Sequence, residues 1–253
     1  MAFRRIRHSF FYRNRDGTSL NQASRDFVVV HYGNSDRATA GMPGFGEFFE
    51  AFVSELRESG KRPDLLLFDA DYHAKEIETE DVTEWDLARL RQVAQAAFGA
   101  IEVRSSKYLA LTYANVKKRM LEEHPKYKGR TQQSFTVKFE DIAVARRWIE
   151  YHGVPLFYAQ VFFDSAYGIS FEGILRALDT GKFTVEKNRR NQEKPTFHIT
   201  VDQGFLISRF QEVPTEFESK MVVFPDGRIA VRAQPIGGSA PIEPDAIRQI
   251  LGR

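Results

Sequence analysis

The spacing of apolar residues predicts several amphipathic helices. From Phe45 onward, apolar residues recur at intervals of three and four, which places them on one face of a helix that ends near Gly60. A helix over residues 141–152 has its stop at Gly153, because glycine accepts the left-handed backbone that commonly closes a helix. The other predicted helices cover residues 82–97, which Gly99 ends, 115–123 and 172–178.

Runs of β-branched and aromatic residues predict strands between these helices. The expected strands cover residues 27–32, 61–68, 135–139, 156–163, 167–171 and 196–201, with a further strand around Glu102. Residues 156–163 are almost continuously apolar, which is typical of a strand covered on both faces. A hairpin is expected where Pro225-Asp226-Gly227 separates residues 221–224 from 229–231. Strands that are interleaved with helices indicate the α/β class.

Length and composition suit one large domain or one domain with a substantial insertion. The chain has 253 residues, of which 42% are hydrophobic and 28% are charged. We expect a core at about residues 45–175, then a basic loop at 182–194 and a β-rich addition at about 180–253. Lys and Arg number 36 against 34 Asp and Glu, so the net charge of +2 does not by itself indicate a nucleic-acid partner.

The absence of cysteine excludes disulfides and thiolate metal sites, and it fits a reducing cytoplasm. The basic start of the chain lacks the apolar segment and cleavage site of a signal peptide. No stretch approaches the roughly 18 uninterrupted apolar residues that a membrane span needs. A cytoplasmic protein without a membrane partner is therefore expected.

Two acids occur where apolar strands are predicted. Glu102 lies between Ile101 and Val103, and Asp64 opens the apolar run that follows Pro63. Magnesium prefers hard oxygen ligands and is usually bound through one or two carboxylates. The sequence therefore predicts Mg²⁺ ligands at Asp64 and Glu102, with the main-chain carbonyl of Val103 as a third oxygen.

A cation follows the second acid. Side chains repeat every two residues along a strand, so Arg104 should lie on the same face as Glu102. Arginine stays protonated, so its role would be electrostatic. Lys107 is the alternative cation if the strand ends at Ser105-Ser106, and the sequence leaves both open.

These residues resemble a known nuclease family. Pro63-Asp64, a long spacer and Glu102-Val103-Arg104 resemble the PD-(D/E)xK motif, with arginine where lysine is usual. Residues 102–106, 154–164 and 167–171 are similar to type II restriction endonucleases of the AccI kind, and the likeness covers roughly residues 60–175. The resemblance implies a restriction-endonuclease-like mixed central sheet flanked by helices, with additional β elements near the C-terminus. It also implies Mg²⁺ at Asp64 and Glu102.

The same resemblance implies a function. It is Mg²⁺-dependent, sequence-specific hydrolysis of double-stranded DNA, and a palindromic target would suit a homodimer. The alternative is a nucleic-acid-binding protein without catalysis, in which Arg104 marks a decayed nuclease site.

Two segments carry the side chains that DNA recognition requires. Arginine and lysine pair with guanine, asparagine and glutamine pair with adenine, and further cations bind phosphates. A solvated loop is the other explanation for each segment. The predicted DNA contacts are Lys126, Lys128, Arg130, Gln132 and Gln133 in the first segment, and Lys187, Arg189, Arg190, Asn191 and Gln192 in the second.

Overall fold

The computed structural model describes most of the chain. Its described residues are 27–33, 44–106, 108–124, 130–188, 191–209, 216–223, 229–236 and 242–252. Within them, only the backbone is described at 187–188, 191–194, 216–223 and 229–236.

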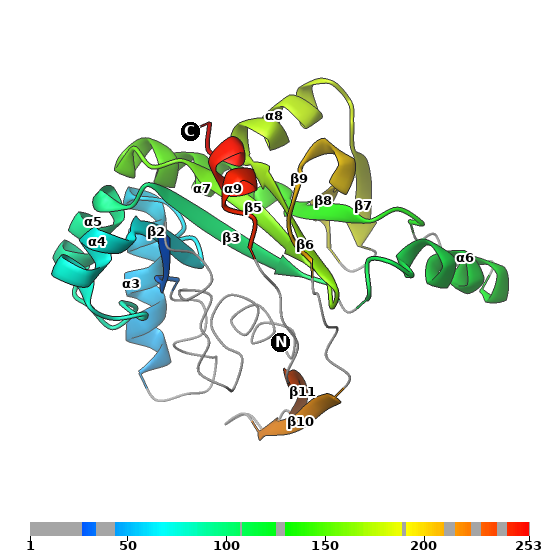
Figure 1. Cartoon of the computed structure of the whole chain (residues 1–253), viewed down its shortest axis with the longest axis horizontal. Coiled ribbons are helices and arrows are strands. Elements are labelled where there is room, and N and C mark those ends of the chain that lie inside the picture. Colours follow the sequence, from blue (N-terminus) through cyan, green and yellow to red (C-terminus); the bar gives the residue numbers. More distant parts are fainter. Residues whose placement is uncertain are drawn as a thin grey trace.

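A six-stranded mixed sheet forms the centre of the molecule (Figure 1). In spatial order its strands are β1 (Phe27–His31), β2 (Leu65–Asp69), β3 (Gly99–Ser105), β5 (Leu156–Val161), β6 (Ser165–Ser170) and β9 (Phe205–Arg209). Only β3 and β5 run parallel among the pairs in this sheet. A parallel pair needs a crossover, and helix α7 (Phe139–His152) belongs to the segment that provides it. The predicted restriction-endonuclease-like α/β fold is confirmed.

Alternate residues of β3 and β5 divide between two apolar cores. Ile101 and Phe157 belong to a cluster with Ile247 of helix α9 (Pro244–Ile250). Ala100 and Leu156 belong to a second cluster that includes residues of α7. The two helices therefore cover opposite faces of the sheet (Figure 1). All six residues of β5 are buried, as predicted for a strand covered on both faces.

The remaining helices largely follow the predicted periodicities. They are α3 (Phe45–Glu58), α4 (Ala70–Tyr72) with the π-helical turn η1 (His73–Ile77), α5 (Leu87–Ala96), α6 (Tyr113–Glu123), α8 (Phe171–Asp179) and the 3₁₀ turn η2 (Val201–Gln203). No helix among the described residues is long and apolar enough to span a membrane.

Three predicted boundaries were wrong near the central strands. The helix expected from residue 82 begins at Leu87, because the Asp86 carboxylate accepts a hydrogen bond from the Arg89 amide and caps it. That helix ends at Ala96, and Gly99 begins β3 instead of ending the helix. The strand expected over residues 61–68 begins only at Leu65, so residues 61–64 form the approach to β2.

A second sheet corrects another prediction. Its strands in spatial order are β4 (Ser134–Lys138), β8 (Asn191–Thr200) and β7 (Thr184–Asn188). The basic loop expected at 182–194 is therefore mostly an antiparallel strand pair, β7 and β8. Charged residues suit such strands where one face meets solvent. The predicted hairpin near the C-terminus is confirmed as β10 (Glu216–Val223) and β11 (Ile229–Ile236), while its turn lies outside the described residues.

Candidate functional site

The strands β2 and β3 separate at Asp64. Their paired ladder ends at Leu65 and Ile101. Beyond that point the Asp64 side chain replaces the ladder, because its Oδ2 accepts a hydrogen bond of 2.8 Å from the Val103 amide. The Asp64 carbonyl in turn accepts hydrogen bonds from the amides of Tyr32 and Gly33 at 3.1 and 3.0 Å. The carboxylate is thus fixed from both neighbouring strands.

Gly33 permits this arrangement. A Cβ atom at Gly33 would lie 3.0 Å from the Asp64 Cα and 3.0 Å from the Pro63 carbonyl oxygen. Contacts this short require the neighbouring backbone to move. The end of β1 therefore lies so close to Pro63-Asp64 that a side chain at residue 33 would require this backbone to shift by a few tenths of an ångström.

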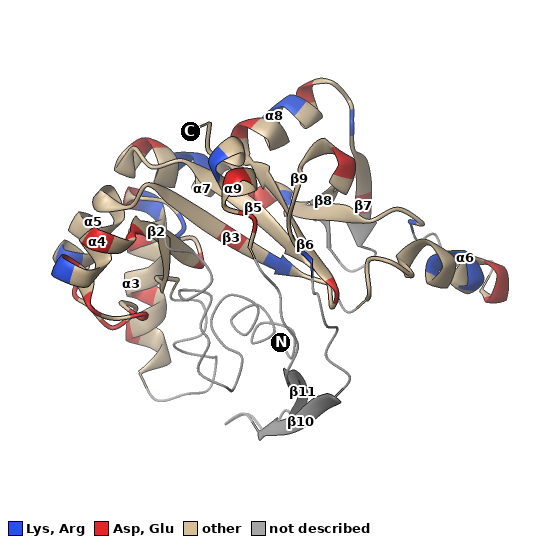
Figure 2. Cartoon of the chain, in the orientation of Figure 1, with Lys and Arg blue, Asp and Glu red and all other residues tan. Residues whose placement is uncertain are grey.

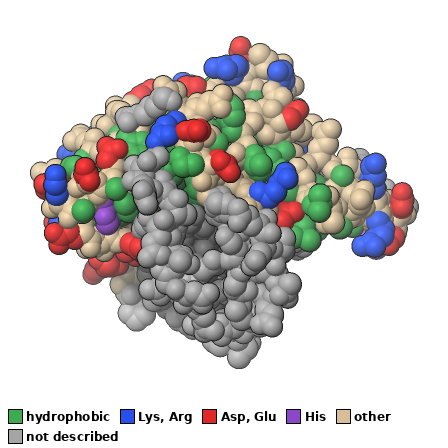
Figure 3. Space-filling view, viewed as in Figure 1, with side chains coloured by type: hydrophobic (Ala, Val, Ile, Leu, Met, Phe, Trp, Pro, Cys, Tyr) green, Lys and Arg blue, Asp and Glu red, His purple; other side chains and the backbone are tan. Residues whose placement is uncertain are grey.

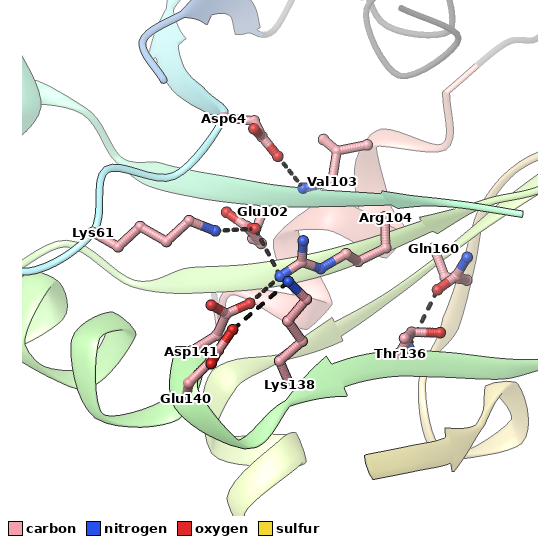
Figure 4. A network of polar contacts seen from close by, with 10 residues as sticks. All are labelled: Lys61, Asp64, Glu102, Val103, Arg104, Thr136, Lys138, Glu140, Asp141 and Gln160. Atoms are coloured by element: carbon pink, nitrogen blue, oxygen red, sulfur yellow. Dashed lines mark hydrogen bonds and ion pairs between the residues drawn. The ribbon is translucent and has the colours of Figure 1, made fainter. Parts of the chain in front are cut away.

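Glu102 lies under two cations in the middle of the sheet. Its side chain is buried, and it points away from the Ile101 face of β3. Glu102 Oε1 lies 2.5 Å from Lys61 Nζ and 3.1 Å from an Arg104 terminal nitrogen, so the two cations reach it from two sides (Figure 4). Figure 2 shows that strand β3 itself carries both an acidic and a basic position.

Arg104 is shared between two carboxylates. Besides Glu102, its guanidinium donates a hydrogen bond to Asp141 in the first turn of α7, where a helix N-terminus favours negative charge. Burial alone would lower the pKa of Arg104, but the charges of Glu102 and Asp141 outweigh it and raise that pKa. Arg104 is therefore a permanent, fixed cation.

The neighbouring strand β5 adds two buried polar residues to this face. Tyr158 and Gln160 lie opposite Glu102 and Arg104 in the parallel register. Burial, followed by the charges of Glu102 and Asp141, raises the pKa of Tyr158 well above its usual value. The phenol thus stays protonated at neutral pH. Gln160 Oε1 accepts a hydrogen bond of 3.2 Å from the Thr136 amide and joins the main sheet to β4.

The predicted metal ligands lie on strand β3 and beside it. The amide and carbonyl of one strand residue point to the same neighbouring strand, so the Val103 carbonyl faces the Asp64 side of β3. Asp64 also contributes, more weakly than Glu102, to the raised pKa of Arg104. Within the described ranges, no three His, Cys, Asp or Glu side chains gather into a metal-binding group. Two carboxylates and one carbonyl nevertheless suit Mg²⁺, which keeps several water ligands.

The two segments expected to contact DNA lie beside each other where their side chains are described. The first segment precedes Ser134, which pairs with Thr200 at the end of β8, whereas the second surrounds the start of β8 at Asn191. Arg130 of the first segment nevertheless reaches Glu186, the residue directly before Lys187 of the second segment.

Side chains are described for only part of these segments. Arg130 lies 3.6 Å from Glu186, and Gln133 donates a hydrogen bond to the Ala110 carbonyl. Gln132 and Gln133 also line a cavity of about 310 Å³ with Thr131, Thr200 and residues of α6 and η2. Lys107, Lys126, Lys128, Arg189 and Arg190 lie outside the described residues, and Lys187, Asn191 and Gln192 have only their backbone described.

Sequence reasoning missed two members of the site. Lys61 was assigned to a strand and Asp141 to the start of a helix, yet both contact the Glu102–Arg104 pair. Figure 4 also shows Lys138 and Glu140, 3.8 Å apart, beside this group. The one sequence signal for Lys61 is its position in Lys61-Arg62, directly before Pro63-Asp64.

Comparison with known proteins gives one extended match. A family model described as AccI restriction endonuclease matches the chain at residues 12–126 and 113–253. A solved nuclease from a fusselovirus is similar over 64% of this chain and 82% of its own, with 10% identity and a TM-score of 0.30. No curated protein sequence matches the chain.

Proposed function

Because the chain belongs to the AccI restriction endonuclease family, and is thereby a nuclease, we propose that it cleaves double-stranded DNA at a specific sequence with Mg²⁺ as its cofactor. One observation supports this most directly. A buried carboxylate, Glu102, lies in the central strand beside the point where Asp64 replaces the β2 ladder. Burying a charge in a strand is costly unless it is paired, so such a residue is expected to have a specific role.

Asp64, Glu102 and the Val103 carbonyl would hold the metal ion. When bound there, a divalent ion activates a water molecule and stabilises negative charge on the phosphate. The protein positions the two carboxylates by the Val103 hydrogen bond and by the buried face of β3.

Arg104 supplies a fixed positive charge to the same site. Its contacts with Glu102 and Asp141 hold the guanidinium in place, and a preorganised charge stabilises charge that develops in the transition state. It binds and orients the phosphate and does not accept a proton. Lys107 is the alternative source of this charge.

DNA recognition would use the two predicted segments beside the second sheet. Arg130 of the first segment lies 3.6 Å from Glu186, which adjoins Lys187 of the second, so the two segments would contact neighbouring parts of one DNA site. The face drawn in Figure 3 mixes acidic and basic side chains over the described residues, so contact with DNA would depend on these local segments. A homodimer would present them symmetrically to a palindromic site.

Incubation with plasmid DNA and Mg²⁺ tests this function. Discrete fragments with a common sequence at their ends are expected, and sequencing those ends gives the recognition site. A gel shift without cleavage, over a range of Mg²⁺ and Mn²⁺ concentrations, would instead support the non-catalytic DNA-binding alternative. Light scattering of the protein with a cleavable duplex measures whether two chains bind one site.

A further inference from the structure

Two consecutive basic residues point to different partners. Arg62 forms a two-point ion pair with Glu55 of α3, and its guanidinium lies 5.7 Å from the centre of the Tyr32 ring. Lys61 points instead to Glu102, where Nζ lies 2.5 Å from Oε1. The segment before β2 therefore supplies one basic residue to the α3 side and one to the site.

The backbone of Lys61 is firmly held. Its amide donates a hydrogen bond of 3.2 Å to the Val144 carbonyl of α7. Gly60 has φ of +86°, and a Cβ there would lie 2.3 Å from that carbonyl oxygen and 2.6 Å from the Trp148 nitrogen. Only glycine combines this conformation with so close an approach. The root of the Lys61 side chain is thus fixed at the site.

The side chain of Lys61 is less confined than that of Arg104. Lys61 is 25% exposed and Arg104 is 14% exposed. Arg104 is held by both Glu102 and Asp141, whereas Glu102 is the single charged partner of Lys61 among the contacts of the described residues. A lysine ammonium is a compact charge on a flexible four-carbon stem, so its tip can move while its root stays in place.

Lys61 and a metal ion would compete for the Glu102 carboxylate, whose Oε1 contacts Lys61. Magnesium lies about 2.0–2.1 Å from its ligands. One carboxylate oxygen cannot hold a divalent ion at that distance and an ammonium at 2.5 Å without strong repulsion between the two cations. Arg104 would retain Asp141 if Glu102 were taken, but Lys61 would lose its partner.

We propose that Lys61 is a catalytic cation of this nuclease, held on Glu102 until the metal ion takes that oxygen and then bound to the scissile phosphate. The proposal rests on the proposed function. A phosphate is the one new anion that cleavage brings to this edge of β3, and a cation on a fixed root can reach it without rearrangement of the backbone. Lys61 would thereby be a cation whose partner changes from Glu102 to the phosphate during the reaction.

Metal binding without DNA tests the first half of this proposal. Calorimetric titration of Mn²⁺ into the Lys61→Gln variant should give a dissociation constant at least about threefold lower than that of the wild type, because the competing cation is gone. Lys75→Gln, an exposed lysine on η1, is the matched control and should leave the constant unchanged. Equal or weaker binding by Lys61→Gln would overturn the proposed competition.

Cleavage tests the second half. At saturating Mg²⁺, single-turnover cleavage by Lys61→Gln should be slower by about a hundredfold, while Lys61→Arg should recover part of that loss. Tighter Mn²⁺ binding with unchanged cleavage would mean that Lys61 only occupies the ligand, and the proposal would fail. A wild type that cuts no DNA would overturn the proposed function instead, while the Mn²⁺ titration would still report on the competition.

Discussion

The segment before β2 contributes one basic residue to each of two charged clusters. The two clusters differ in how their cations pair with their carboxylates. In the structural pair, Arg62 and Glu55, one guanidinium meets one carboxylate at two points. In the cluster that we propose to be catalytic, Lys61, Arg104, Glu102 and Asp141, two cations share Glu102, while Arg104 is the ion-pair partner of Asp141 among the described residues. The structural pair therefore matches one cation to one carboxylate. In the catalytic cluster, the proposed movement of Lys61 would change the partners when a metal ion and a phosphate arrive.

This difference separates stability from activity. Removing one member of a buried ion pair leaves an uncompensated charge, and the cost falls on folding. Removing a member of the catalytic cluster should alter an interaction that gains strength during the reaction, and the cost falls on turnover. The predictions below are ranked by their expected effect on cleavage.

The carboxylates of the site should have the largest effect. Asp64→Ala or Glu102→Ala is expected to abolish cleavage and to leave specific DNA binding largely intact, because each removes a metal ligand and no base contact. Plasmid cleavage and gel-shift assays measure the two properties separately. Cleavage within about tenfold of the wild type would contradict a ligand role, since tenfold is only about 1.4 kcal/mol of activation barrier.

Substitution of Arg104 should cause the next largest loss of cleavage. Arg104→Ala is expected to lose at least about a hundredfold in cleavage rate, and Arg104→Lys should keep part of the activity because a positive charge remains. Lys107→Ala should have a mild effect. The opposite ranking in single-turnover assays would move the catalytic cation to Lys107 and leave Arg104 as a structural partner of Asp141.

Substitution of Gly33 should reduce cleavage less, because it acts indirectly through the position of Asp64. The Gly33→Ala variant must displace the Pro63-Asp64 backbone, so we expect cleavage to fall by about tenfold, in line with the cost of misplacing a catalytic group. Gly46→Ala in α3 is the control, because its Cβ would meet nothing and alanine favours a helix by about 1 kcal/mol. Equal cleavage by the two variants, both folded by circular dichroism, would show that Asp64 tolerates the shift.

The local pattern of the sequence predicted most of the central sheet. Strand β5 and helix α7 were found because continuous and three-to-four apolar spacing are properties of neighbouring residues. The strands β7 and β8 were missed because their charged residues resemble those of a loop until β4 is seen to pair with β8. Strand β9 and helix α9 were also missed, and both become recognisable through their packing on β6.

The candidate site remains a prediction, but the structure shows which of its contacts a sequence can indicate. Asp64 and Glu102 were proposed because an acid at an apolar strand is a local signal. Lys61 contacts Glu102 across 41 positions, and Asp141 contacts Arg104 across 37. Such contacts follow only from the sheet register and the docking of α7. Lysine and aspartate at helix and strand boundaries are otherwise common.

The structural pair should have the smallest effect on cleavage, and it tests the comparison most directly. Arg62→Leu is expected to lower the free energy of unfolding by about 1–3 kcal/mol, because it removes the two-point ion pair with the half-buried Glu55 carboxylate. The double variant Glu55→Leu/Arg62→Leu should recover most of that loss, since two apolar side chains replace two matched charges. Urea unfolding measures both.

At a temperature where each variant is folded, cleavage should stay within about threefold of the wild type, because neither residue contacts Glu102. A stable Arg62→Leu variant with a hundredfold loss of cleavage would place Arg62 in the catalytic cluster and remove the distinction between the two.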